Sequence, residues 1–341
     1  MPHQADTPLV SIIIKALNEE AKIAACIESA LAALKNCYGE VILADSGSTD
    51  RTIEIASAYP IRIVQLADTS QRRCGIGPQL GYQFSHGEFV YILDGDMEMD
   101  PEFIEHAVRE MQADEKLGGV AGIVDEQSIG SMQFRGRQMR NEEGTAGDAS
   151  WLDMGGLYRR RALEQVGYMS NRNLHAYEEQ ELGLRLRSKN WTLRRLPVRS
   201  VKHWGHTEAT LPLLAKRWRS GYAMGSGEIL RASLGRAYFG GILKTQKHTL
   251  FTLGLIGLLL IGLVTAPATH VFLVSWLLIM VLLVIYRIAK HKNIRDGLLS
   301  IIVWHVNAVA LVRGFMHTPV DPNTKIDAVI ITDYQPRKTP M

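Results

Sequence analysis

Cysteine is scarce in this 341-residue chain, and so are the marks of a secreted protein. Cysteine occurs three times, at positions 26, 37 and 74, too few for a disulfide framework, which favours a reducing compartment. The first residues lack the basic and then apolar order of a secretory signal peptide, so we expect no such peptide. Charged residues make up 21% and aromatic residues 7%, beside 46% hydrophobic residues, a composition that excludes a disordered or collagen-like chain.

Charge is missing altogether from one long segment. No Asp, Glu, Lys or Arg occurs from Thr249 to Tyr286. The segment is interrupted at 266–270, and at ~1.5 Å per residue each half is about long enough to cross a ~30 Å hydrocarbon core. Basic residues flank both outer ends and none lies in the connection, so the positive-inside rule predicts a transmembrane hairpin, 249–266 and 270–287, with cytoplasmic outer ends. The alternative, a buried hairpin in a soluble core, is disfavoured because soluble helices rarely lack a charged face over such a length.

The segments on either side of the hairpin are each compatible with more than one placement relative to the membrane. A third apolar segment, 297–313, contains His305 and Asn307 and is compatible with a span, a re-entrant segment or an interfacial helix. Residues 211–248 mix basic and aromatic side chains at helical spacing, a pattern typical of an amphipathic helix in the lipid headgroup layer and equally of an ordinary surface helix. Residues 314–341 are expected to form a C-terminal tail.

The net charge of +3 is the sum of opposite net charges on two parts of the chain. Residues 241–341 contain ten of the 38 Lys and Arg residues but four of the 35 Asp and Glu residues, so this part carries +6 and the first 240 residues carry −3. A nucleic-acid-binding protein would place its basic excess on the folded domain. We therefore expect membrane lipids, and not nucleic acid, as partners of the basic part.

Residues 1–210 have the pattern of a single α/β domain. Short β-branched runs predict buried strands at 10–14, 41–44, 61–64 and 89–93, with amphipathic helical segments between them. This order predicts a mostly parallel sheet with helices on both faces, whose ligands lie beyond the carboxyl ends of the strands. Three segments fall there, and all carry carboxylates: 15–20, 45–50 and 94–96.

The third of these segments has the chemistry of a metal site. Asp94 and Asp96 flank Gly95 directly after a predicted strand. Mg²⁺ and Mn²⁺ accept a few carboxylates together with substrate phosphate oxygens, so one of these two ions is the expected cofactor. Asp-x-Asp alone also occurs in solvated turns, and it is the neighbouring acidic strand ends that favour the metal site.

An ordered set of motifs resembles family 2 glycosyltransferases of the GT-A fold. The resemblance covers about residues 9–230 and is closest to the inverting, membrane-associated enzymes of bacterial polysaccharide synthesis. The residues that carry it are Asn18-Glu19-Glu20, the run from Asp45 to Asp50, Asp94-Gly95-Asp96, Gly155-Gly156 before Tyr158-Arg159-Arg160, and the run from Glu178 to Leu182.

The resemblance implies a role for each matching position. The nucleotide base and ribose would be held by Ala16, Leu17, Glu19 and Asp45. The metal and diphosphate would be held by Asp94 and Asp96, with Asp96 as the main metal ligand. Further donor contacts are expected from Arg73, Gly155, Gly156, Arg217 and Trp218. Histidines near the metal or diphosphate would be His203 and His206, for which an ordinary surface loop is the equal alternative. Lys15 stands where many relatives have proline.

The resemblance also assigns the catalytic base to Glu179, with Glu178 beside it on the acceptor. Inverting transfer needs a base on the side of the sugar opposite the leaving group. Adjacent helical residues point about 100° apart, so the two carboxylates are not expected to face the same carbon. The alternative is an acidic first turn that complements a helix dipole, which is a common pattern.

These observations together predict a membrane-bound, inverting, metal-dependent glycosyltransferase. The donor would be a nucleotide sugar, most simply UDP-linked, and the acceptor a lipid-linked (polyprenyl) saccharide at the cytoplasmic face of the plasma membrane, in exopolysaccharide or lipopolysaccharide synthesis. Transfer directly to polyprenyl phosphate and a non-catalytic scaffold of a polysaccharide assembly complex are the alternatives. The sequence is compatible with a homo-oligomer.

Overall fold

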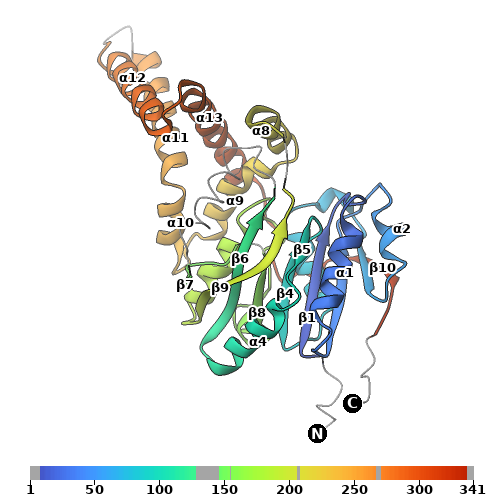
Figure 1. Ribbon diagram of the computed structural model, residues 1–341. Helices are drawn as coiled ribbons and strands as arrows, with labels where there is room; N and C mark the ends of the chain where they lie inside the picture. Colours follow the sequence, from blue (N-terminus) through green and yellow to red (C-terminus); the bar gives the residue numbers. More distant parts are fainter. Residues whose placement is uncertain (1–7, 128–145, 154, 206–207, 266–269, 336–341) are drawn as a thin grey trace. The chain divides into compact units, whose positions relative to one another are not determined.

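The computed structural model describes residues 8–127, 146–153, 155–205, 208–265 and 270–335 (Figure 1). The chain divides into two compact units. The first comprises residues 1–208 and 319–341, and the second comprises residues 209–318. His206, one of the two expected histidines, lies outside the described residues.

The first unit is built on a mixed β-sheet. In sheet order its main strands are β10 (Ala328–Thr332), β3 (Arg62–Leu66), β2 (Gly39–Asp45), β1 (Val10–Ala16), β4 (Phe89–Asp94), β8 (Gly156–Arg159), β6 (Leu117–Glu126), β9 (Thr192–His203) and β5 (Met97–Met99), and β7 (Gly147–Asp148) pairs with β9. The four strands predicted from the sequence, β1 to β4, pair in parallel. The predicted α/β class is confirmed, but the sheet is mixed and not mostly parallel, because β5, β7, β8 and β10 pair antiparallel with their neighbours.

Helices cover both faces of this sheet. Side chains on β1 accordingly alternate between two buried clusters, one on each face. Ile12 and Ile14 pack in one cluster with α1 (Ile23–Ala33) and α4 (Phe103–Ala113). Ile13 packs in the other, with residues of α3 (Ile76–Gln83), α6 (Arg160–Gln165) and α7 (Glu178–Arg187). This period-two alternation is what a strand buried on both sides requires. The short helix α2 (Thr52–Ala56) follows β2.

The end of the chain returns to the first unit. Strand β10 pairs antiparallel with β3, and Ile326 just before it is fully buried. Arg62 on β3 bonds Asp333 at 2.9 Å, and Arg172 donates to the carbonyl of Thr324 at 2.7 Å. A β-branched run at 328–332 carried the signal for this strand, whereas the sequence analysis expected only a tail.

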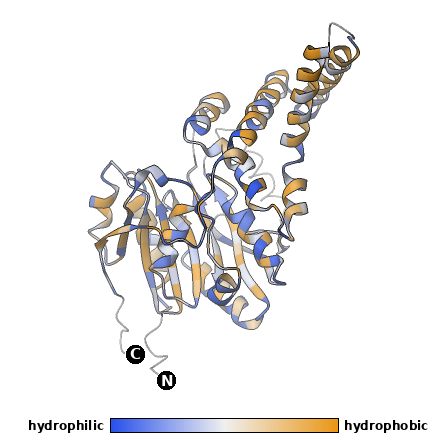
Figure 2. Cartoon of the chain, turned by 180° about the vertical axis from the view of Figure 1, so that it is seen from behind, coloured by the Kyte–Doolittle hydropathy of each residue, from blue (hydrophilic) through white to orange (hydrophobic). Residues whose placement is uncertain are grey.

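The second unit is helical. It contains α8 (Thr210–Arg219), α9 (Gly225–Ala232), α10 (Phe239–Thr245), α11 (Lys247–Thr265), α12 (Val271–His291) and α13 (Ile294–Met316). Helices α11, α12 and α13 are long and apolar enough to cross a membrane, and Figure 2 shows them predominantly in the hydrophobic colour. The two predicted hairpin segments thus correspond to two of three candidate spans. Segment 297–313, for which the sequence allowed several placements, forms the central part of the third candidate span, α13.

Helices α9 and α13 are packed with their backbones close together. A Cβ atom on Gly227 would lie 1.9 Å from the carbonyl oxygen of Leu311, and one on Gly314 would lie 2.1 Å from that of Met224. Only glycine fits such an approach. Arg217 and Trp218 lie on α8 in this unit, where Arg217 stacks over the Tyr222 ring, with 4.8 Å between Cζ and the ring centroid.

Candidate active site

The carboxyl ends of β1 and β2 are joined by their loops. Asn18, in a left-handed conformation with φ of 58°, accepts a hydrogen bond from the amide of Thr49, and its own amide donates to Ser48 Oγ at 2.8 Å. Asp45 is fully buried and accepts bonds from the amides of Gly47 and Ser48 at 2.8 Å each. The expected nucleotide contacts Ala16 and Asp45 are therefore buried at this edge, whereas the Leu17 side chain is 41% exposed.

The first Asp of the Asp-x-Asp motif ends β4 beside Lys15, at the end of β1. The two residues are register partners in the parallel pair β1–β4. Lys15 Nζ lies 3.1 Å from Asp94 Oδ1, 3.3 Å from Glu178 Oε1 and 3.7 Å from Glu179 Oε1. One ammonium group thus links the predicted diphosphate end of the site to the predicted base. In the sequence, Lys15 stands out only because many relatives have proline at this position.

Lys15 stays charged in spite of its burial. Burial lowers the pKa of its ammonium group, but Asp94, Glu178 and Glu179 together raise it well above its ordinary value. Glycine at position 77 leaves room for it, because a Cβ there would lie 2.9 Å from Lys15 Cβ. The site therefore contains a fixed positive charge surrounded by carboxylates.

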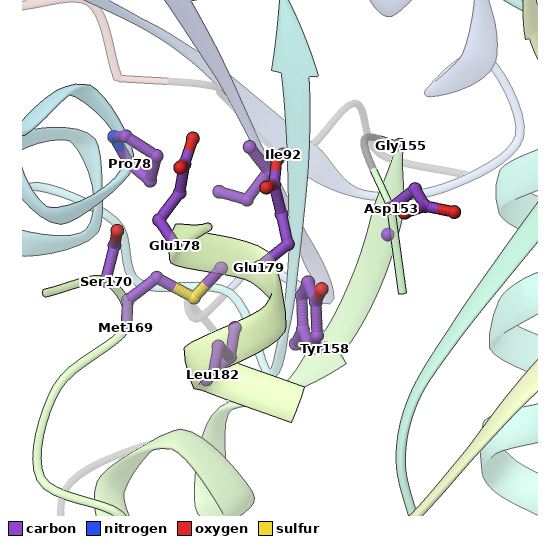
Figure 3. A pocket seen from close by; sticks show the side chains of 11 residues that line it. Pro78, Ile92, Asp153, Gly155, Tyr158, Met169, Ser170, Glu178, Glu179 and Leu182 are labelled. Carbon is purple, nitrogen blue, oxygen red and sulfur yellow. The ribbon is translucent and has the colours of Figure 1, made fainter. Parts of the chain in front are cut away.

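The two acids of α7 line one pocket. Tyr177 precedes the helix with φ of 69°, and Glu178 and Glu179 follow as the first helical residues. Figure 3 shows both side chains at the start of the helix, Glu178 beside Pro78 and Glu179 beside Ile92. The empty space of the pocket, open solvent included, is about 310 Å³. Its lining residues are Pro78, Ile92, Asp153, Gly155, Gly156, Tyr158, Met169, Ser170, Glu178, Glu179 and Leu182. The acidic turn thus faces a cavity, which a purely dipole-complementing role would not require.

Glu179 has the protonation behaviour of a base poised near neutral pH. Burial and the neighbouring charge of Glu178 raise its pKa to about 8, against the opposing effect of Lys15. A general base works best when its pKa lies near the working pH. The geometry therefore brings the predicted base, Glu178, Asp94 and the expected glycines Gly155 and Gly156 to one place.

The second Asp of the motif faces a histidine. His203 Nε2 lies 3.5 Å from Asp96 Oδ2, and Nδ1 lies 2.7 Å from Glu126 Oε2. Burial lowers the pKa of His203, but its hydrogen bonds to Asp96 and Glu126 raise it to about 9. The two carboxylates thus favour the protonated ring of His203, and ligation of a metal through Nε2 would require loss of that proton. Sequence reasoning missed Glu126, which only the pairing of β6 with β9 brings beside His203.

The donor atoms here fit a hard divalent cation shared with a substrate. Burial and repulsion from Asp96 raise the pKa of Glu19 to about 7, a clustering of carboxylates that a cation would relieve. Among the described residues no group of three or more His, Cys, Asp or Glu is arranged to hold a metal alone. Asp94 and Asp96 would therefore hold Mg²⁺ or Mn²⁺ with phosphate oxygens completing the coordination.

Arg73 is placed differently from the other expected residues. It lies between the short turn at Thr69–Gln71 and α3, and its Nη1 donates to the carbonyls of Ser70 and Arg72. Arg72 donates to the carbonyls of Ser46 and Gly47, and so fastens this loop to the one after β2. The donor contact expected of Arg73 stays a prediction.

Comparison with known proteins agrees with this geometry. Residues 11–167 match the model of the Glycosyl transferase family 2. A low-salt glycan biosynthesis hexosyltransferase, Agl6 of Haloferax volcanii, is 37% identical over 118 residues, covering 33% of this chain and 27% of that protein. A dodecaprenyl-phosphate galacturonate synthase of Rhizobium johnstonii is 32% identical over 113 residues, covering 30% of this chain and 32% of that protein. The matches thus span about a third or less of these relatives.

A solved structure extends the likeness in fold. The mannosyltransferase PcManGT from Pyrobaculum calidifontis, in complex with GDP-Man and Mn²⁺, superposes with a TM-score of 0.58 over 91% of this chain and 89% of its own, at 17% identity. At that identity the likeness concerns the fold. Together the two findings show that residues 11–167 carry a Glycosyl transferase family 2 domain and that the fold is of the GT-A type.

Proposed function

We propose that this chain transfers a hexose, with inversion, from a nucleotide-sugar donor to a hydroxyl group of a lipid-linked saccharide. The observation that carries the proposal is the placement of Glu179, with a pKa near 8, in a pocket beside Asp94 and the fixed cation Lys15. The UDP-linked donors expected from the sequence and the GDP-linked donor of the solved relative are both nucleotide sugars. We expect a donor panel to decide between them.

Five residues in or beside the pocket have tasks in this reaction. Glu179 removes the proton of the acceptor hydroxyl as the oxygen forms its bond to the anomeric carbon, and the bond from that carbon to the diphosphate breaks on the opposite side. A divalent cation, when bound, neutralises charge on the departing diphosphate. Asp94 and Asp96 hold that end of the donor, Lys15 favours the ionised form of Glu179, and Glu178 orients the acceptor.

The three apolar helices favour a lipid-linked acceptor. A transferase attached to the bilayer meets its acceptor at the headgroup layer, and the basic residues that flank the hairpin favour a cytoplasmic catalytic domain at the plasma membrane. This orientation matches the cytoplasmic supply of nucleotide sugars.

Transfer directly to polyprenyl phosphate is the second candidate, because one relative is named a dodecaprenyl-phosphate galacturonate synthase. A phosphate monoester has a second pKa of about 6, so its oxygen is already ionised at neutral pH and needs no base. The two acceptors therefore make different demands on Glu179. A hydroxyl acceptor needs the base, whereas a phosphate acceptor does not.

The test uses the full purified chain in detergent with a panel of nucleotide sugars, Mg²⁺ or Mn²⁺, and either polyprenyl diphosphate saccharides or polyprenyl phosphate. Nucleoside diphosphate release and glycolipid product are measured for the wild type and Glu179→Gln. We expect metal-dependent turnover with the saccharide acceptors and its loss in Glu179→Gln. Turnover with polyprenyl phosphate that survives Glu179→Gln would replace the first candidate by the second, and the absence of turnover with every donor would favour the non-catalytic scaffold.

A further inference from the structure

Arg287, near the end of α12, is buried although it belongs to a basic segment. Its side chain and backbone together are 7% exposed. Nε donates to Ser300 Oγ on α13 at 2.8 Å, and Nη2 lies 2.8 Å from His291 Nε2. The guanidinium group stacks over the Trp304 ring with Cζ 4.3 Å from the centroid. Arg287 is thus held in one orientation by two helices.

A third helix completes this cluster. His248, in the first turn of α11, stacks on the same Trp304 ring, with 4.9 Å between the two ring centroids and 20° between the ring planes. The start of α11, the end of α12 and the first half of α13 therefore meet at one end of the second unit. We call His248, Arg287, His291, Ser300 and Trp304 the three-helix cluster.

Arg287 has a positive charge without an ion-pair partner among the described residues. The nearest acid along the chain, Asp296 in the first turn of α13, interacts electrostatically with His291 of the cluster. The Nη1 atom of Arg287 donates to no described group. It is also not one of the described polar atoms that are closed off from solvent and lack a hydrogen-bond partner. A buried cation without a counter-ion is costly, and in an apolar helix unit such a residue marks a binding site whose partner has yet to be supplied.

A topology signal alone does not explain this arrangement. Lys290, Lys292 and Arg295 are exposed, and exposed cations are sufficient to keep this end on the cytoplasmic side. Arg287 instead points into the cluster, where its aromatic platform and its bond to Ser300 fix the planar fork. That fork matches phosphate oxygens, and the aromatic face supports the guanidinium.

We propose that the three-helix cluster binds the phosphate head group of a membrane lipid. Arg287 Nη1 supplies the main donor, the ring nitrogens of His248 and Nδ1 of His291 add to it, and Trp304 forms the floor. Polyprenyl phosphates and glycerophospholipids present this same chemistry at the bilayer surface, and basic pockets between membrane helices are a known way of holding it. The site lies within the second unit, so the proposal is independent of the transferase reaction.

Binding is measured on the full chain, delipidated in neutral detergent and without donor, by microscale thermophoresis. The probes are undecaprenyl phosphate, dioleoyl phosphatidic acid, neutral undecaprenol and inorganic phosphate. We expect both lipid phosphates to bind at least tenfold more tightly than undecaprenol and inorganic phosphate. Preference for undecaprenyl phosphate would identify the polyprenyl lipid as the ligand, and equal affinity would identify a general site for lipid phosphates.

Two substitutions with the same charge change separate the cluster from surface attraction. Arg287→Met should weaken both lipid phosphates at least tenfold, while Arg295→Met, at an exposed position, should change them less than threefold. Equal losses in the two variants, wild-type affinity in Arg287→Met, or equal binding of inorganic phosphate and the lipids would overturn the proposal. Should Arg287→Met fail to fold, His248→Phe keeps the stacking on Trp304 but removes the ring nitrogens, and it should weaken binding at least threefold; unchanged affinity there would also count against the site.

Discussion

Replacing Lys15 with methionine removes the fixed cation from the pocket and should make Glu179 a poorer base at neutral pH. Lys15 Nζ lies 3.7 Å from Glu179 Oε1. At an effective dielectric constant of ~20, two unit charges ~4 Å apart interact by ~4 kcal/mol, which corresponds to ~3 pKa units. Water that enters the enlarged pocket screens the remaining carboxylates, so we expect the pKa of Glu179 to rise by about 1 to 2 units.

The sign of the effect follows from which form of Glu179 is active. Its pKa is already raised to about 8 from an ordinary value of 4.5, so kcat/KM should rise with pH and level off above about 8. In Lys15→Met the rising limb of the kcat/KM profile moves to higher pH. At pH 7.5 the ionised fraction of Glu179, and with it the rate, should fall about 8- to 80-fold for a rise of about 1 to 2 units in its pKa.

The assay is a pH profile of kcat/KM from pH 6 to 10 for the wild type, Lys15→Met and Lys15→Arg. Lys15→Arg keeps the charge and should keep the limb near its wild-type position. The methionine variant should recover most of its loss at the alkaline end. A loss in Lys15→Met that is the same at every pH, with the limb unmoved, would refute the reasoning and show that Lys15 acts on the donor instead.

Three further substitutions, one of them with a control, test the metal site, a buried ion pair and the packing of the second unit. Asp96→Ala should weaken Mn²⁺-dependent nucleotide binding by about 10- to 100-fold in isothermal titration while metal-free binding stays unchanged; equal losses with and without Mn²⁺ would argue against a metal role. Arg185→Met leaves the fully buried carboxylate of Glu181 without the guanidinium that lies 2.9 Å away, and should lower the free energy of unfolding by about 3–5 kcal/mol in denaturant melts; an unchanged midpoint would contradict this. Gly227→Leu should destabilise the second unit by about 1–3 kcal/mol through overpacking against α13, whereas Gly240→Ala, with nothing within 4 Å of its Cβ position, should leave the melting temperature of that unit unchanged.

The sequence was most informative where one physical rule acts alone. Buried strands give continuous β-branched runs, so β1 to β4 and the carboxylates at their ends could be predicted without tertiary knowledge. An uncharged segment of membrane length is equally direct, and it predicted α11 and α12. The third span was harder because His305 and Asn307 lower its hydropathy, although the helix runs from Ile294 to Met316.

What the sequence left out depends on contacts between distant segments. The direction of the Lys15 side chain follows from the β1–β4 register and from the place of α7, which is more than 160 residues away. Glu126 reaches His203 only through the pairing of β6 with β9. Strand β10 needed the return of the chain after the second unit, which local pattern does not reveal. Each of these features is local in space and remote in sequence.

The account rests on Glu179 as the base of a sugar transfer, and one measurement tests this most directly. Glycolipid formation from the best donor and a lipid-linked saccharide acceptor is followed for the wild type, Glu179→Gln and a matched control, Glu105→Gln, whose side chain is exposed on α4. We predict wild-type turnover in the control and a loss of about 10²- to 10⁴-fold in Glu179→Gln, with donor affinity unchanged. Wild-type turnover in Glu179→Gln on that acceptor would contradict the account.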